Sequence, residues 1–226
     1  MATVLVTGFA PFDGFEENPS GQLARALDGR RAGDAIIAGH VLPVAFDAAG
    51  PALLRLVEAL RPDAIVATGQ AAGEAVIRLE QVAINRAHSA RPDNAGYAPH
   101  QCAIDPDGPA ARFVALDLHP LATALTAAGV PARVSFHAGT HCCNLVLYTA
   151  LAVRPAAALF VHLPLLPTQG LAKDGAGPLP SMALAIMEQA VLAAAEAAFA
   201  AAGEGAMPPA PALVARAPGP RRPAPA

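Results

Sequence analysis

Short apolar runs alternate with longer amphipathic segments along almost the whole chain, and this alternation most constrains the fold. The apolar runs have the length of buried strands, whereas the longer segments repeat their apolar residues with a helical period. Strands are predicted at residues 3–7, 35–44, 63–68, 132–136 and 159–162, an extended segment at 77–84, and helices at 18–27, 47–60, 117–128, 145–153 and 181–202. Strands that alternate with helices form mostly parallel sheets covered on both faces. The sequence therefore predicts an α/β fold: a single-domain three-layer α/β/α sandwich with a mixed, largely parallel sheet.

Two stretches without periodic apolar residues set the expected domain organisation. Residues 86–109 are rich in Pro, Asp, Asn and Gly, which predicts a long surface loop that acts as a lid or a subunit contact. The last stretch is rich in Pro and Ala and is predicted to be disordered. We therefore expect one domain over residues 1–203 and a tail over residues 204–226.

Serines mark two of the predicted helix starts. Ser20 follows Asn18 and Pro19, and Ser181 precedes the last, Ala-rich helix. A serine side chain can accept a hydrogen bond from a free backbone N–H of the first turn. Ser20 and Ser181 are thus the expected N-caps.

The composition excludes several classes of function. The chain has 226 residues, 54% of them hydrophobic, so it can bury a full core. A net charge of −3, no Trp and no Lys/Arg cluster argue against nucleic-acid binding. We expect no apolar run to approach the roughly 20 residues of a membrane span, and therefore no membrane partner and a cytoplasmic protein. Three cysteines, two of them adjacent, are an odd count and are expected to be free thiols.

The adjacent cysteines are the strongest candidates for chemistry. Cys142 and Cys143 follow a Gly-Thr-His turn and precede an apolar helical stretch. Unpaired N–H groups and the positive end of the helix dipole favour a thiolate at such a position. Position along the chain does not choose between the two. A metal site with His141 is not expected, because the spaced ligand pairs of a structural zinc site are missing.

A histidine and a glutamate are candidate partners for the thiolate. His162 ends a predicted buried strand close before Pro164, which places its ring at the rim of the sheet. Glu80 lies among alternating apolar residues, so its carboxylate is either solvated on the outer face or buried with a partner. A cysteine nucleophile needs such a base and a group that orients the base.

Three phenylalanines follow the first predicted strand: Phe9, Phe12 and Phe15. They either anchor the loop or form the apolar wall of a pocket for a small flat ligand. The glycine spacing of this loop does not match a nucleotide-binding motif.

Read together, these segments resemble the type I pyroglutamyl peptidases, also called pyrrolidone-carboxylate peptidases, over about residues 1–200. The resemblance is carried by the order and spacing of short motifs at residues 5–12, 18–20, 69–71, 80–85, 92–94, 106–109, 138–140, 143–144, 160–164 and 180–182. It implies that Cys143, rather than Cys142, is the nucleophile, that His162 is the base and then the acid, and that Glu80 orients His162. It further implies a homotetramer and the hydrolysis of N-terminal pyroglutamyl residues from peptides through a thioester, with no metal or organic cofactor.

The implied substrate carries a neutral lactam instead of a free amine. A matching pocket needs apolar walls and a few hydrogen-bonding groups. By resemblance, Phe9, Phe12 and Phe15 are expected to form the walls. Asn18 and Gln70 are expected to make polar contacts or to support the loop. The oxyanion is expected to be held by the Cys143 N–H and by a donor near Ala90 and Arg91.

The chain departs from the family pattern at a few positions, and this leaves alternatives. His141 and Cys142 replace an apolar, often aromatic, stretch, Glu74 stands where Gly and a basic residue are usual, and Arg91 lies one place later than the usual arginine. One alternative is a catalytically impaired pyroglutamyl-peptide binding protein on the same scaffold. A phosphorylase-like enzyme is another, but it would need a basic anion site that the sequence lacks.

Overall fold

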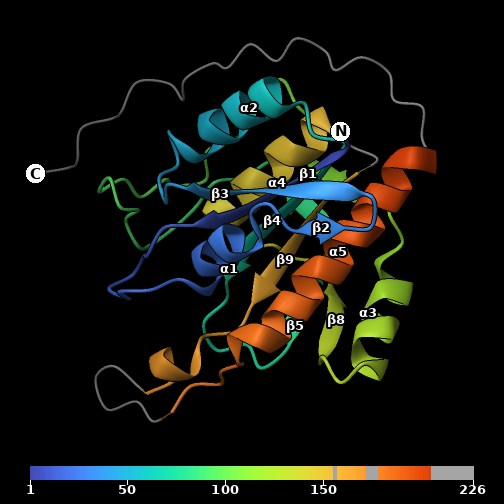
Figure 1. Cartoon of the computed structure of the whole chain (residues 1–226). Helices are drawn as coiled ribbons and strands as arrows, with labels where there is room; N and C mark the ends of the chain where they lie inside the picture. Colours follow the sequence, from blue (N-terminus) through green and yellow to red (C-terminus); the bar gives the residue numbers. More distant parts are fainter. Residues whose placement is uncertain (155–156, 172–177, 205–226) are drawn as a thin grey trace, which may run out of the picture.

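The computed structural model describes residues 1–154, 157–171 and 178–204 (Figure 1). Its strands are β1 Thr3–Phe9, β2 Arg31–Ala32, β3 Ala35–Leu42, β4 Ala64–Gln70, β5 Ile77–Glu80, β6 Val82–Ile84, β7 Ala111–Phe113, β8 Ala132–Ser135 and β9 Ala158–Leu163. Its helices are α1 Pro19–Leu27, α2 Ala49–Leu60, α3 Leu118–Ala127, α4 Cys142–Val153 and α5 Leu184–Glu204, with a 3₁₀ turn η1 at Pro167–Gln169. The predicted tail over residues 204–226 lies outside the described residues, except for Glu204.

Seven strands form one mixed sheet in the order β2-β3-β1-β4-β9-β5-β8. Strands β3, β1, β4 and β9 run parallel, whereas β5 is antiparallel to β9 and β2 is antiparallel to β3. Helices α2 and α4 cover one face, and α1, α3 and α5 cover the other (Figure 1). The predicted α/β sandwich with a mixed, largely parallel sheet is thus confirmed.

The central strands are apolar over most of their length because both of their faces are covered. Residues Val4–Val6 of β1 and Ala64–Ala67 of β4 have no exposed surface. Parallel strands that are buried on both faces cannot alternate polar and apolar residues. Their carboxyl ends at Phe9 and Gln70 meet at one edge of the sheet, where open α/β folds place their sites.

Both predicted serine caps are wrong. Asn18 caps α1, and its side-chain oxygen accepts from the Ser20 N–H at 3.1 Å and the Ser20 hydroxyl at 2.7 Å. The Ser20 oxygen instead accepts from the Phe9 N–H at 3.0 Å and so ties the end of β1 to α1. Ser181 forms an isolated bridge with Leu165, and α5 begins only at Leu184.

The segment predicted as extended at 77–84 is divided between two sheets. Strand β5 joins the large sheet, whereas β6 pairs with β7 in a separate two-stranded sheet. The short strand β7 is not among the predicted strands. The predicted loop at 86–109 contains no helix or strand, only an isolated bridge between Ala87 and Cys102. It is held against the turn before α4 by two hydrogen bonds. The His88 N–H donates to the Thr140 carbonyl at 3.0 Å, and the Thr140 hydroxyl donates to the His88 carbonyl at 2.7 Å.

Helix α5 corrects one prediction about apolar runs. Its residues Leu184–Gly203 are long and apolar enough to cross a membrane by length and composition. The apolar character of this stretch comes largely from alanine, which makes it a weak signal in the sequence. Met187, Val191 and Ala194 are fully buried, and the helix packs on β4 and β9. In this fold α5 belongs, with α1 and α3, to the helical layer that covers one face of the sheet.

Candidate active site

Helix α4 places two cysteines in its first turn. The turn before it contains Gly139 with a φ of +83°, a backbone conformation that favours glycine. His141 is the N-cap residue and makes no capping hydrogen bond with its side chain. The first-turn N–H groups therefore have no side-chain partner from the cap, and they can stabilise negative charge beside the helix start.

The two cysteines have different surroundings. Cys142 is buried with 1% exposure, whereas Cys143 is partly exposed. Burial, reinforced by neighbouring negative charge, raises the pKa of the Cys142 thiol far above its ordinary range. The structure thus separates an inert thiol from one that can react, a choice that chain position alone left open.

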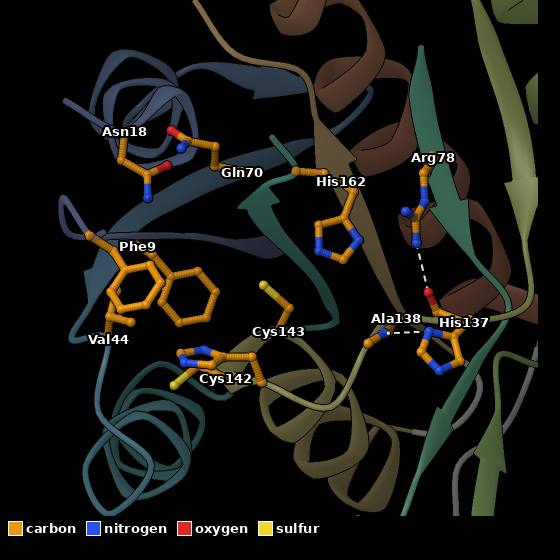
Figure 2. Close-up of a pocket in the computed structure, with 14 residues that line it drawn as sticks. Phe9, Asn18, Val44, Gln70, Arg78, His137, Ala138, Cys142, Cys143 and His162 are labelled. Carbon is orange, nitrogen blue, oxygen red and sulfur yellow. Dashed lines mark hydrogen bonds between the residues drawn. The ribbon is translucent and has the colours of Figure 1, made fainter. Parts of the chain in front are cut away.

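His162 reaches Cys143 from the strand at the centre of the site. Strand β9 lies between β4 and β5, and His162 pairs with Gly69 on one side and Arg78 on the other. Its ring is therefore at the carboxyl end of an interior strand rather than at a lateral edge of the sheet. The Nδ1 atom lies 2.7 Å from Glu80 Oε1, which leaves the other ring nitrogen for Cys143. Figure 2 shows the His162 ring beside the Cys143 sulfur.

The charges around His162 favour its protonated form. Burial alone would lower the pKa of His162, but the charge and hydrogen bonding of Cys143 and Glu80 outweigh burial and raise the pKa to about 9. For Glu80, burial would raise the pKa, but hydrogen bonding and charge from His162, with help from Ser135 and Arg78, lower it. The geometry can hold a thiolate, an imidazolium and a carboxylate in a row.

The Glu80 carboxylate is buried with a partner, and is not solvated on the outer face of the sheet. Its exposure is 0% because β5 runs antiparallel to β9, so the carboxyl end of β5 points away from the open edge of the site. Arg78 Nη2 also contacts Glu80 Oε1, at 2.7 Å. Arg78 is not among the predicted site residues, because its contact with Glu80 depends on how β5 and β9 pair.

A cavity of about 310 Å³ opens beside these side chains. Figure 2 shows the Cys143 sulfur facing this space, with the His162 ring on one side and Phe9 and Val44 on the other. The lining consists of Phe9, Phe12, Asn18, Val44, Gln70, Ala71, Arg78, His137, Ala138, Gly139, His141, Cys142, Cys143 and His162. Among these residues there is no Asp or Glu, so the lining that the structure describes offers no carboxylate to a substrate ammonium group.

Two predicted substrate-binding residues lie outside the cavity lining. Asp13 and Gly14, both with positive φ, turn the chain just before Phe15 and place it outside the lining. The Arg91 side chain is 71% exposed and pairs with Asp13. The Arg91 N–H donates to the Ser89 hydroxyl at 3.0 Å, so this amide already has a partner.

Two predicted polar residues do line the cavity, and both also have structural partners. Asn18 donates from Nδ2 to the Ala10 carbonyl at 3.0 Å, in addition to capping α1. Gln70 accepts at Oε1 from Gln169 Nε2 at 3.0 Å. Asn18 therefore supports the loop, and Gln70 presents an amide whose oxygen is held by η1.

Some lining residues were not predicted as site residues. Val44 and His137 come from segments that follow β3 and β8, so only the folded sheet brings them together. His141 departs from the family pattern. The centroid of its ring lies 5.0 Å from that of Phe12 and 4.6 Å from that of Phe46. Within the described part of the chain, no group of three or more His, Cys, Asp or Glu residues is arranged to hold a metal ion.

Comparison with known proteins gives one consistent result. A family model described as pyroglutamyl peptidase matches residues 2–201. The pyrrolidone-carboxylate peptidase of Cupriavidus taiwanensis is 46% identical over 190 residues, covering 81% of this chain and 87% of that protein. The protein of the same name from Pseudomonas fluorescens is 42% identical over 202 residues, or 86% and 93% of the two chains. The structure of pyrrolidone carboxyl peptidase from Thermococcus litoralis aligns with a TM-score of 0.85 at 32% identity, over 90% of this chain and 96% of that chain.

Proposed function

The chain belongs to the pyroglutamyl peptidase family, and we propose that Cys143, His162 and Glu80 form the catalytic triad with which it removes N-terminal pyroglutamyl residues from peptides. The resemblance seen in the sequence is confirmed, and the chain is a cysteine-type exopeptidase. The single observation that carries the triad is the 2.7 Å contact between Glu80 Oε1 and His162 Nδ1. It fixes the imidazole with its other nitrogen toward Cys143.

The first half of the reaction forms a thioester. The Cys143 thiolate attacks the pyroglutamyl carbonyl carbon, and the His162 imidazolium donates its proton to the leaving peptide amine as the C–N bond breaks. Glu80 stabilises the imidazolium and keeps Nδ1 protonated. The backbone N–H of Cys143, at the positive end of α4, supplies a donor for the oxyanion.

The second half of the reaction hydrolyses the thioester. Neutral His162 takes a proton from a water molecule, whose oxygen attacks the thioester carbonyl. The C–S bond breaks, pyroglutamate leaves, and the thiolate and imidazolium are restored. No step requires a metal or an organic cofactor.

The cavity supports a neutral cyclic substrate. Phe9 and Phe12 supply apolar surface, and Gln70 supplies an amide close to it. We propose that the lactam ring lies against these phenylalanines while Gln70 contacts its polar edge. Because no acidic residue lines the described cavity, a substrate with a charged N-terminal ammonium would lose hydration without gaining a counter-ion.

Hydrolysis of a fluorogenic pyroglutamyl amide tests this proposal. The wild-type protein should cleave it and should reject the matching prolyl amide, which has a charged ring nitrogen and no lactam carbonyl. Cys143→Ala and His162→Ala should abolish cleavage, whereas Cys142→Ala should retain it. Cleavage that survives in the Cys143 variant would exclude this thiol as the nucleophile.

We further propose that the protein acts in the cytoplasm as a homo-oligomer, with a tetramer expected from the resemblance. Phe113 and Phe136 are each 64% exposed and could be covered by a second copy. The three cysteines are free, as in a reducing compartment. Light scattering on the eluted protein, and fractionation of the cells that express it, test the two statements separately.

A further inference from the structure

Arg78 lies opposite the proposed general base in the sheet. It pairs directly with His162 across the antiparallel β5 and β9 ladder. Glu80 follows two residues later on β5, so Arg78 and Glu80 face the same side of the sheet. The strand register thus brings an arginine and a glutamate to the same imidazole.

One carboxylate oxygen serves both neighbours. Glu80 Oε1 is 2.7 Å from Arg78 Nη2 and 2.7 Å from His162 Nδ1. The Glu80 side chain has 0% exposure and that of Arg78 has 16%. The contact with His162 is a hydrogen bond and that with Arg78 is an ion pair, and the attraction between charges shielded from water is stronger than between exposed ones.

Arg78 is itself held from two further directions. Its Nη1 donates to Glu74 Oε1 at 2.9 Å, and Nη2 donates to the His137 carbonyl at 2.6 Å (Figure 2). Glu74 also contacts Arg133 at 3.2 Å. Burial would raise the pKa of Glu74, but Arg78 and Arg133 lower it, so this carboxylate is charged at neutral pH.

We propose that Arg78 is a positioning residue for the peptidase reaction. Fixed by Glu74 and the His137 carbonyl, it holds the Glu80 carboxylate in the one orientation that directs the His162 imidazole at Cys143. This inference rests on the proposed function, because it assigns the support of the same triad. Without Arg78, the Glu80 carboxylate could rotate and the imidazole would lose its fixed direction.

Removing the guanidinium also changes the charges that face His162. The charged or titratable groups around the pair are Glu74 before β5, Arg78 and Glu80 on β5, Arg133 on β8, His137 after β8, and Cys143 on α4. Loss of one nearby positive charge makes protonation of His162 easier. The alkaline limb of the activity profile should therefore move to higher pH.

Arg78 also lines the cavity, so a direct contact with the substrate is the competing role. The two roles affect different kinetic parameters. A residue that orients the triad changes kcat and the pH profile, whereas one that only binds the substrate changes KM.

The test compares Arg78→Gln, Arg78→Lys and Glu74→Gln with Arg55→Gln, which removes an exposed arginine of α2 that does not line the cavity. We expect Arg78→Gln to lower kcat about tenfold, to change KM less than about twofold, and to move the alkaline limb up by about half a pH unit. Arg78→Lys should recover part of kcat, Glu74→Gln should show a smaller loss, and Arg55→Gln should match the wild type. An unchanged kcat and pH profile in Arg78→Gln, or a rise in KM alone, would overturn the inference.

A second measurement separates this inference from the proposed function. The rate at which iodoacetamide alkylates Cys143 reports the thiolate without any substrate. If the wild type does not cleave pyroglutamyl amides, the function fails, but a shifted alkylation profile in folded Arg78→Gln or Arg78→Lys still supports the positioning role. Alkylation profiles that coincide with that of the wild type overturn it.

Discussion

Gly69 and Cys143 lie so close together that no side chain fits between them. A β-carbon at position 69 would stand 2.8 Å from the Cys143 sulfur and 2.9 Å from the Phe160 ring. Gly69 pairs with His162 in the β4 and β9 ladder, so this contact lies directly beside the triad. The absence of a side chain at position 69 leaves the thiol its place next to the imidazole.

Gly69→Ala should therefore impair catalysis. The new methyl group must push the sulfur or the Phe160 ring away, and a displacement of about 1 Å can cost roughly a hundredfold in rate. We expect kcat/KM for a pyroglutamyl amide to fall by about that factor. Gly203→Ala is the control, because a methyl group there meets no atom of residues 1–154, 157–171 and 178–204 within 4 Å. An alanine at position 69 with unchanged kcat/KM would show that the sulfur can move without loss.

Glu80→Gln should impair catalysis and shift the pH dependence. A glutamine amide can donate to His162 Nδ1 and so favour the wrong tautomer, and loss of the carboxylate removes one of the causes that raise the pKa of His162 to about 9. Wild-type activity should fall as pH rises through about 9, where the imidazolium loses its proton. In Glu80→Gln this limb should move to lower pH, and kcat/KM should drop about a hundredfold or more.

Measurement of kcat/KM between about pH 5 and 10 checks the Glu80 prediction. The unfolding midpoint of the variant, measured in parallel at each pH, identifies any loss caused by unfolding. If the alkaline limb of the Glu80→Gln activity profile stays at the wild-type pH or moves to higher pH, the assigned role of the carboxylate is contradicted.

The periodic pattern of the sequence was sufficient to predict the fold class, because buried strands and amphipathic helices differ in period. The sequence pattern was less informative where two residues could cap the same helix, or where one extended segment could form one strand or two. Asn18 and Ser20 are both good capping residues, and only the fold shows that the Ser20 oxygen is occupied by the Phe9 N–H. Strands β5 and β6 follow each other so closely that a continuous extended segment could not be distinguished from two strands in separate sheets.

The site could be predicted in part, because some of its residues lie in local patterns and others do not. Cys143 stands at a helix start and His162 at a strand end, which are signals within a few residues. The burial of Glu80 and the role of Arg78 depend on the antiparallel pairing of β5 with β9, two strands that are far apart in sequence. Such a pairing leaves no trace in the periodicity of either strand, so these features required the structure.

His141→Phe should stabilise the protein, most strongly in acid. The His141 ring packs between Phe12 and Phe46, and its buried Nε2 has no hydrogen-bond partner in the described part of the chain. An unpaired buried polar atom costs about 1–3 kcal/mol. Burial also lowers the pKa of His141 below its ordinary value of 6.5, so the unfolded chain binds a proton more readily than the folded one.

The sign of the pH effect follows from this lowered pKa. Stability contributed by neutral His141 is present above about pH 6.5 and is lost as pH falls below it. The advantage of His141→Phe in the free energy of unfolding should therefore grow between pH 7 and 5. Urea unfolding at both pH values measures it, with His119→Phe on the exposed face of α3 as the control. A constant difference at the two pH values would contradict the neutral, buried state of this histidine.

Asn144→Ala should destabilise the fold next to the nucleophile. The Asn144 side chain has 1% exposure, accepts from the Ile84 N–H at 2.9 Å, and donates to the carbonyls of Ile84 at 2.8 Å and Arg86 at 3.0 Å. It thus joins the start of α4 to β6 and to the beginning of the 86–109 loop. Alanine would leave these backbone groups without their partner, at about 1–3 kcal/mol for each group that stays buried and unpaired.

We expect Asn144→Ala to lower the free energy of unfolding by about 2 kcal/mol or more, and to lower kcat/KM because the first turn of α4 loses its anchor. Urea unfolding and hydrolysis of the pyroglutamyl amide measure the two effects. Asn94→Ala is the matched control, since its exposed side chain makes a single hydrogen bond to the Pro11 carbonyl and should cost less than about 1 kcal/mol. If the two variants lose the same free energy of unfolding, the three hydrogen bonds of the buried Asn144 amide do not stabilise the contact between α4 and β6.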